Sequence, residues 1–200
     1  MVRYRGKGRN EKMKLYLVLI FSSVLYANPI FPGNGAILNY IHVLFEWEQT
    51  PNTNYYNIEI AEDVNFSNIV YITTDSTLCF IERNHLEWDK EYYWRVNSFY
   101  HTGLTSNWSE VYSFRTSEQL SNSSSLIIDH QGMENGVTIF GAFFNYFSAV
   151  IDSLGKEIWN SGSDNFVYYS SNEIGNIFGC SLIQNAENNL PGKEISFDGI

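Results

Sequence analysis

Apolar and polar side chains alternate along the front half of the chain, in short runs that turn residues separate. A period of two is the pattern of a β-strand with one buried face. Three runs show it best, and their apolar faces hold Val43, Phe45 and Trp47 in HVLFEW, Tyr56, Ile58 and Ile60 in YYNIEIA, and Tyr92, Trp94 and Val96 in YYWRVNSFY. The runs IVYITTD, STLCFIE and VYSFRT are also strand-like, and no helical stretch separates them. Residues 28–116 are therefore predicted to form an antiparallel β-sandwich.

The aromatic side chains between residues 91 and 118 allow two interpretations. In the first, Trp94 and its neighbours on the same face pack inward, and Trp108 and Phe114 follow them into the core. In the second, an exposed aromatic platform binds sugars or bases, which requires ring faces open to solvent. This alternative is limited to the other aromatic side chains of the stretch, which are Tyr93, Phe99, Tyr100 and His101.

The strand pattern restarts after SEQLSNSSS, residues 117–125, a polar and Ser-rich segment that we predict to be a linker. The runs GVTIFGAFF, YFSAVID, KEIW, FVYY and IFGCSLI indicate further short strands within residues 126–200. In AVIDSLGKEIW, Asp152 is placed to accept hydrogen bonds from turn amides and Gly155 to adopt positive φ. We therefore expect a hairpin that returns into Trp159.

Charge is distributed unevenly along the 200 residues. The first 14 residues carry six cations and one acid, a net charge of +5, whereas the whole chain carries −10. The rest of the chain must therefore carry −15. A body this acidic repels phosphate backbones, so a nucleic-acid partner is not expected.

An uncharged apolar run, LYLVLIFSSVLYA at residues 15–27, follows these cations directly. It is shorter than the roughly 20 residues that a transmembrane helix needs. A basic segment, a short apolar run and a small residue at Ala27 are typical of a secretory signal peptide. Residues 1–27 are predicted to be this signal, starting at Met1 or at Met13. The mature protein is then secreted or periplasmic and has no stable membrane span; an uncleaved membrane anchor is the alternative.

Side chains that carry chemistry are few and scattered. Cys79 and Cys180 would meet an oxidising compartment, either as two buried thiols or as a disulfide between the two halves. The histidines lack metal-ligand spacing and are expected to be solvated; they are His42, His85, His101 and His130. Motifs for glycosylation begin at Asn65, Asn107 and Asn122, and we expect them to be unmodified. The sequence thus predicts no catalytic, cofactor-binding or metal-binding residue and no cofactor.

Several stretches of the front half resemble the fibronectin type III domains of bacterial secreted proteins. The resemblance covers about ninety residues and includes NPIFPGNGA, Trp47, YYNIEIAEDVNF, YYWRV and SNWSEVYSFRT. Leu86 lies six residues before Tyr92, and in that family this pair forms the tyrosine corner. The resemblance implies that the Tyr92 hydroxyl ties the crossover loop to backbone. One departure is that EWDKE stands where the family has Pro-Gly, which leaves the shape of the loop open.

The segment NGVTIFGAFFNYFSAVIDSLGKEIWNSG resembles the opening of the arylsulfotransferase-like family, whose members place a small β-sandwich ahead of a β-propeller. Its D-x-x-G-K-x-x-W pattern, from Asp152 to Trp159, is similar to the hairpin turns of propeller blades. The resemblance covers about seventy residues and implies a propeller-like set of β-hairpins. A propeller closes only with several four-stranded blades, so the set in residues 126–200 is expected to be incomplete and its apolar edges open.

The predicted fold class is therefore all-β, an immunoglobulin-like sandwich of the fibronectin type III kind followed by an incomplete propeller-like segment. These features favour a non-catalytic extracytoplasmic module that spaces, displays or docks another unit, with an unidentified protein or glycan as partner. The alternative is the amino-terminal fragment of an arylsulfotransferase-like propeller enzyme whose catalytic blades lie outside this chain. No residue here matches the catalytic His of that family, so no catalytic role is transferred.

Overall fold

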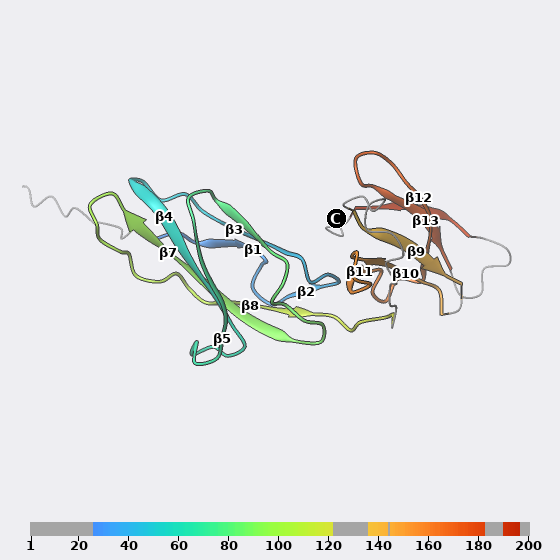
Figure 1. Cartoon of the computed structure of the whole chain (residues 1–200), viewed down its shortest axis with the longest axis horizontal. Helices are drawn as coiled ribbons and strands as arrows, with labels where there is room; N and C mark the ends of the chain where they lie inside the picture. Colours follow the sequence, from blue (N-terminus) through green and yellow to red (C-terminus); the bar gives the residue numbers. More distant parts are fainter. Residues whose placement is uncertain (1–25, 122–135, 144, 183–189, 197–200) are drawn as a thin grey trace, which may run out of the picture.

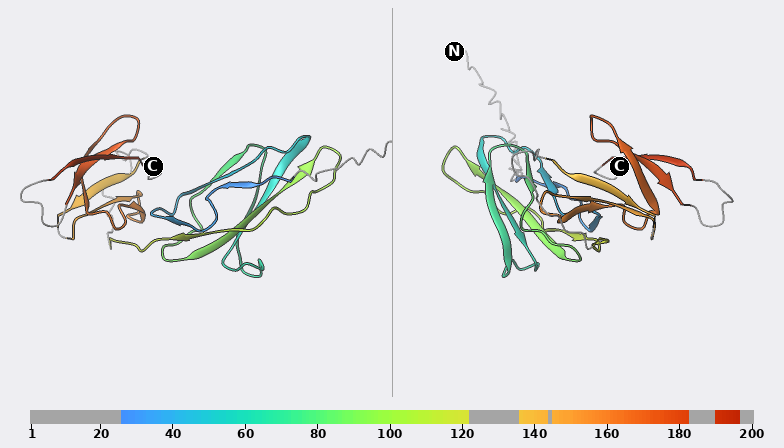
Figure 2. Two further views of the ribbon diagram at one scale, coloured as in Figure 1. Left: turned by 180° about the vertical axis from the view of Figure 1, so that it is seen from behind. Right: turned by 45° about the vertical axis from the view of Figure 1, so that its right-hand side comes forward.

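The computed structural model describes residues 26–121, 136–143, 145–182 and 190–196, and every regular element in these ranges is a β-strand. The prediction of an all-β fold is confirmed for this part of the chain. Two β-units lie end to end along the long axis of the molecule (Figure 1). Figure 2 shows the same arrangement from behind and after a turn of 45°. Among these residues, none belongs to an apolar helix long enough to span a membrane.

The first unit is a sandwich of two sheets. Its strands are β1 (Pro29–Phe31), β2 (Ala36–Leu38), β3 (Val43–Trp47), β4 (Thr53–Ala61), β5 (Ile69–Asp75), β6 (Cys79–Glu82), β7 (Glu91–Tyr100) and β8 (Tyr112–Thr116). One sheet has the order β1-β3-β6 and the other the order β2-β8-β7-β4-β5. All neighbours are antiparallel except β2 and β8, which are parallel. This strand order is that of a fibronectin type III sandwich, in which β5 pairs with β4 in the larger sheet.

The alternation read from the sequence marks the core of this sandwich correctly. Trp47 and Phe114 are 1% exposed and Trp94 is 0% exposed. Phe45 of β3 lies between the sheets, with its ring centroid 5.1 Å from that of Trp94 and 5.7 Å from that of Phe114. Burying a large apolar side chain contributes about 1.5–3 kcal/mol, so this aromatic cluster helps to hold the two layers together. The core-packing interpretation is confirmed for these residues.

The tyrosine corner forms as the resemblance implied. The Tyr92 hydroxyl accepts a hydrogen bond of 2.9 Å from the Glu87 backbone N–H, and Leu86 beside it is 1% exposed. Burial raises the pKa of the Tyr92 phenol, which keeps the hydroxyl protonated. The bond holds the crossover between the two sheets at the start of β7.

Trp108 does not enter the core, and this part of the prediction is wrong. Its half-buried ring lies on the outer face, 4.5 Å from the guanidinium carbon of Arg95, and the Phe66 ring lies 3.9 Å from the same carbon. The inward place belongs to Ser109, which is 7% exposed and whose hydroxyl accepts from the Val96 backbone N–H at 3.1 Å. Because neighbouring residues of an extended segment face opposite ways, an inward Ser109 turns Trp108 outward.

The second unit consists of two three-stranded antiparallel sheets. Its strands are β9 (Thr138–Ala142), β10 (Phe147–Ile151), β11 (Glu157–Asn160), β12 (Phe166–Ser171), β13 (Ile177–Ser181) and β14 (Gly192–Ile195), in the orders β11-β10-β9 and β12-β13-β14. The Ser148 hydroxyl of β10 joins the sheets, donating to the Phe166 carbonyl at 2.9 Å and accepting from the Tyr168 N–H at 2.8 Å. A Cβ on Gly141 would lie 2.8 Å from the Tyr168 nitrogen, so β9 and β12 approach closely only because this residue is glycine. Neither sheet closes on itself within the described residues.

The hairpin turn after β10 has the predicted geometry. The Asp152 carboxylate accepts from the backbone N–H groups of Leu154 and Lys156 at 2.8 and 2.9 Å, and Gly155 has a φ of 81°. The turn between β12 and β13 repeats it twenty residues later. There Asn172 accepts from Ile174 and Asn176 at 3.1 and 2.9 Å.

Replacing Tyr92 with Phe tests the tyrosine corner. The substitution keeps the buried ring but removes the acceptor of the Glu87 N–H, so we expect the free energy of unfolding to fall by about 1 kcal/mol. Tyr93→Phe is the matched control, because the Tyr93 hydroxyl bonds to the exposed Glu91 side chain, where water can replace the lost bond. Urea unfolding followed by tryptophan fluorescence measures both variants. Equal stability of the two variants would contradict an anchoring role for the Tyr92 hydroxyl.

Candidate functional site

The two units are joined by β-type hydrogen bonds. The Ile41 N–H donates to the Ile158 carbonyl at 3.0 Å, and the Asn160 N–H donates to the Asn39 carbonyl at 2.9 Å. Between these bonds, Tyr40 and Trp159 form an antiparallel bridge. Residues 39–41 of the sandwich therefore extend the β11-β10-β9 sheet along its β11 edge. The expectation of open apolar edges is not met at this edge, because the sandwich covers it.

A buried carboxylate lies at the centre of this junction. Glu157 of β11 is 0% exposed, and its two carboxylate oxygens accept from the backbone N–H groups of Leu120 at 3.0 Å and Ser121 at 2.7 Å. The Asn160 side-chain amide donates a third bond, of 2.7 Å. Burying a charged group costs several kcal/mol unless it is hydrogen-bonded, and these charge-assisted bonds offset that cost. Glu157 thereby fixes the chain as it leaves the sandwich.

The start of the predicted linker is consequently an ordered part of the junction. The Ser117 N–H donates to the Leu38 carbonyl at 2.8 Å, and the Glu118 carbonyl accepts from the Asn160 side chain at 2.9 Å. Ser121 is 8% exposed. Residues 117–121 are thus held on both sides, whereas residues 122–125 of the predicted linker lie outside the described residues.

The crossover loop of the sandwich also reaches the second unit. The Trp88 indole N–H donates to the Glu157 carbonyl at 2.8 Å. Asp89, which follows it, has a positive φ of 54° and donates its N–H to the Ser117 carbonyl at 2.9 Å. Trp88 belongs to EWDKE, the stretch that stands where the family has Pro-Gly. The sequence pattern predicted no role for Trp88, although a large aromatic residue in a surface loop was a signal that could have indicated one.

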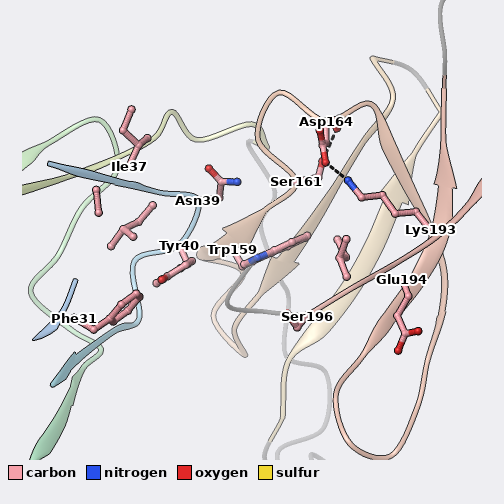
Figure 3. Close-up of a pocket in the computed structure, with 13 residues that line it drawn as sticks. Phe31, Ile37, Asn39, Tyr40, Trp159, Ser161, Asp164, Lys193, Glu194 and Ser196 are labelled. Atoms are coloured by element: carbon pink, nitrogen blue, oxygen red, sulfur yellow. Dashed lines mark hydrogen bonds and ion pairs between the residues drawn. The ribbon is translucent and has the colours of Figure 1, made fainter. Parts of the chain in front are cut away.

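A groove of about 460 Å³ opens beside the junction, between the two units (Figure 3). Phe31, Ile37 and Tyr40 line its sandwich side, and Trp159 and Ile195 line the other. Figure 3 shows Lys193 paired with Asp164 on the side of the second unit. The groove therefore combines apolar walls with a charged rim. Its lining contains no group of three or more His, Cys, Asp or Glu side chains placed to hold a metal ion, and the rest of the described chain has none either.

Two contacts involve the face of β7 that carries the alternative aromatic platform. Phe99 stacks on Tyr55 of the neighbouring strand, with ring centroids 4.6 Å apart and ring planes 12° apart, so each ring covers a face of the other. Arg95, with its two aromatic neighbours, lies between Phe99 and Tyr93 on β7. His101 is exposed in the turn that follows. Phe99 therefore offers at most one open ring face, which disfavours a platform built on several open faces side by side.

The three described histidines differ in how far they are exposed to solvent. His42 is half-buried, and its pKa is lowered, first by burial and then by the Arg83 charge. The His85 ring nitrogen Nδ1 lies 3.0 Å from the buried Glu82 carboxylate, and the ring stacks on Tyr71 at 4.5 Å. His85 and His101 are exposed, as expected, so only the half-buried His42 departs from the expectation. His130 lies outside the described residues.

The cysteines and the described glycosylation motifs differ in how far they are exposed to solvent. Cys79 and Cys180 are both free thiols, and Cys79 is exposed rather than buried, whereas Cys180 is buried as expected. The structure therefore contains no disulfide between them. Asn65 and Asn107 are exposed, and Asn122 lies outside the described residues.

No known family profile matches the chain, and no curated protein matches its sequence. Solved structures that resemble it include a Fn3-like protein from Clostridium thermocellum (TM-score 0.37, 13% identity, covering 48% of this chain and 97% of that one). The fibronectin type III domain of human fibronectin type III domain containing protein 3 gives a TM-score of 0.37 at 19% identity, covering 50% and 92%. An α-L-rhamnosidase from Dictyoglumus thermophilum gives 0.38 at 17% identity, covering 63% and 16%. The fold assignment rests on the strand order and not on these similarities.

Replacing Glu157 with Gln tests the junction. The amide keeps the size of the side chain but turns one acceptor into a donor, which would face a backbone N–H of Leu120 or Ser121. We expect the free energy of unfolding to fall by about 1–3 kcal/mol. Glu173→Gln, on an exposed turn, is the control and should change little. Chemical denaturation measures both variants, and an unchanged midpoint for Glu157→Gln would show that the carboxylate does not stabilise the junction.

Proposed function

We propose that the sandwich is a non-catalytic positioning module, which caps the following β-unit and holds it at a fixed distance and orientation. The observation that carries this proposal is the junction itself. It combines main-chain pairing of residues 39–41 with β11, the buried Glu157 carboxylate, and the Trp88 indole. A flexible tether between independent domains needs none of these contacts.

The open edge of β11 supports a capping role for the sandwich. The rings of Phe45, Trp94 and Phe114 pack between the two sheets of the sandwich, and the buried core continues from the sandwich into the second unit. The β11 strand ends its sheet, and an exposed strand edge offers unpaired backbone groups to other chains. Residues 39–41 occupy that edge. The sandwich thus protects and orients the second unit.

Distance measurements between spin labels test this proposal. One label is attached to the exposed Cys79 of the sandwich and the other to Glu173→Cys in the second unit, while the buried Cys180 stays unlabelled. A fixed junction predicts one narrow distance distribution, and Trp88→Phe combined with Glu157→Gln should broaden it. Tyr93→Phe is the control that leaves the junction intact. A broad distribution in the parent protein would refute fixed positioning.

We further propose that the module works outside the cytoplasm, after removal of residues 1–27. Cleavage after Ala27 leaves Asn28 as the first residue, and Asn28 is well placed to begin the fold. Its carbonyl accepts from the Glu48 N–H at 2.9 Å and its side chain donates to the Glu48 carboxylate at 2.7 Å. Ala27 is 0% exposed and belongs to the hydrophobic core, so cleavage after it removes one small buried side chain and has to precede folding.

The mass of the exported protein tests this second proposal. Expression with a secretion-competent host should yield a chain that begins at Asn28 in the extracytoplasmic fraction. Replacing Ala27 with a large residue such as Phe should block cleavage, because the enzyme that removes signals favours a small residue there. A mature mass that retains Met1 or Met13 would contradict cleavage.

A second candidate function is that of an amino-terminal portion of an arylsulfotransferase-like propeller enzyme. The observation that favours it is the repeated turn, because Asp152 and Asn172 organise equivalent hairpins twenty residues apart. Regular repetition of hairpins is typical of propellers. The test is transfer of sulfate from an aryl sulfate to phenol by a protein that also contains the sequence following Ile200. Activity there, with none in the present chain, would support this candidate, and a following sequence without further hairpins of this kind would exclude it.

A further inference from the structure

The groove between the units is lined by two edge strands. β2 ends the five-stranded sheet of the sandwich, and β14 ends the β12-β13-β14 sheet of the second unit. Ala36, Ile37 and Leu38 of β2 face Lys193, Glu194 and Ile195 of β14 across the same cavity. Neither strand has a second strand partner among the described residues. A groove between two strand edges differs from an ordinary apolar pocket, because its walls also offer backbone hydrogen-bonding groups.

The hydrogen-bond pattern between β13 and β14 determines which backbone N–H and C=O groups of β14 point away from β13, toward the unpaired edge of the sheet. The Ser181 N–H donates to the Pro191 carbonyl at 3.1 Å, and the register continues with Gly179 opposite Lys193 and Ile177 opposite Ile195. In an antiparallel pair, hydrogen-bonded positions alternate with positions whose N–H and C=O point away. Residues 191, 193 and 195 therefore bond to β13. The backbone N–H and C=O of Glu194 point outward from the sheet.

The side chains of the groove define what else an occupant must carry. Ile37 is 71% exposed although it is a large aliphatic residue, and Phe31, further along the same wall, is half-buried (Figure 3). These side chains can be covered by apolar groups that project from one face of an extended chain. On the opposite wall, Lys193 is paired with Asp164. Glu194 adds a further negative charge, and one oxygen of its carboxylate accepts a hydrogen bond of 2.5 Å from the Asn176 side-chain amide. The chain as a whole is also acidic, with a net charge of −10.

We propose that the groove binds an extended polypeptide segment of a partner protein by strand addition to β14. The segment pairs its backbone with Glu194, places alternate apolar side chains against Ile37 and Phe31, and carries a Lys or Arg toward the Glu194 carboxylate. This binding function rests on the proposed positioning role, because the groove exists only while the junction holds the two units together.

The experiment selects binders from a display library of random dodecapeptides on the immobilised chain. Strand addition predicts enriched peptides with apolar residues at alternate positions and a net positive charge. A selected peptide is then synthesised with single N-methyl groups along its backbone. Methylation at residues of one parity should abolish binding and methylation at the other parity should not, because only alternate amides face β14. No enrichment of this pattern, or equal tolerance of every N-methyl group, overturns the proposal.

Variants of the chain locate the site. Glu194→Pro removes the outward N–H and should weaken binding by about tenfold or more, while Glu194→Ala keeps that N–H and should have a smaller effect. Ile37→Arg should also abolish binding. The matched control is Ile72→Arg, a change on the exposed edge strand β5 at the far side of the sheet, where Ile72 is 55% exposed. Equal loss in Ile72→Arg, or full binding by Glu194→Pro, contradicts strand addition at β14.

The spin-label distances separate this proposal from the positioning role. They are measured on the same Glu194→Pro and Ile37→Arg proteins used for binding. A narrow distribution with lost binding supports strand addition in an intact groove. A narrow distribution with full binding refutes it while leaving the positioning role standing. If either variant does not fold, the N-methylated peptides on the parent chain decide the question alone.

Discussion

The exposed backbone of a strand edge is the constraint on which the arrangement of this protein depends. In an all-β chain, each sheet ends in strands whose N–H and C=O groups must be paired, covered or kept from other chains. At β11 the protein pairs the edge with residues 39–41 of the sandwich. Once that pairing is made, the orientation of the two units is set, because β-type hydrogen bonds tolerate little change in direction or distance.

A buried carboxylate strengthens the pairing between β11 and the sandwich. Glu157 has no exposed surface. Its carboxylate oxygens accept hydrogen bonds from the backbone N–H groups of residues 120 and 121, which are not part of a β-strand. The backbone carbonyl of Glu157 accepts a hydrogen bond from the Trp88 indole N–H. One residue of β11 therefore contacts the exit from the sandwich through its side chain and the crossover loop through its backbone. An apolar residue at position 157 would fill the space but leave those donors without acceptors.

The groove is a consequence of the same constraint. Pairing at β11 brings the ends of two other sheets, β2 and β14, to opposite walls of one cavity, and neither gains a strand partner in the described residues. The apolar side chains of Phe31 and Ile37 line that opening. The junction that holds the two units together thus also creates a place where a third strand fits.

The sequence by itself determined the features that depend on neighbouring residues. The period of two identified the inward rings of Trp47 and Trp94, the Leu86–Tyr92 spacing identified the corner, and Asp152 with Gly155 identified the turn. Only the tertiary structure decided that the Trp108 side chain points outward, that the Trp88 indole donates a hydrogen bond to Glu157, and that residues 192–195 form β14. Trp88 and Glu157 are 69 residues apart, and nothing in the local pattern of either residue refers to the other. A local pattern reports which face of a strand avoids water, whereas the partner across that face depends on how distant segments fold against each other.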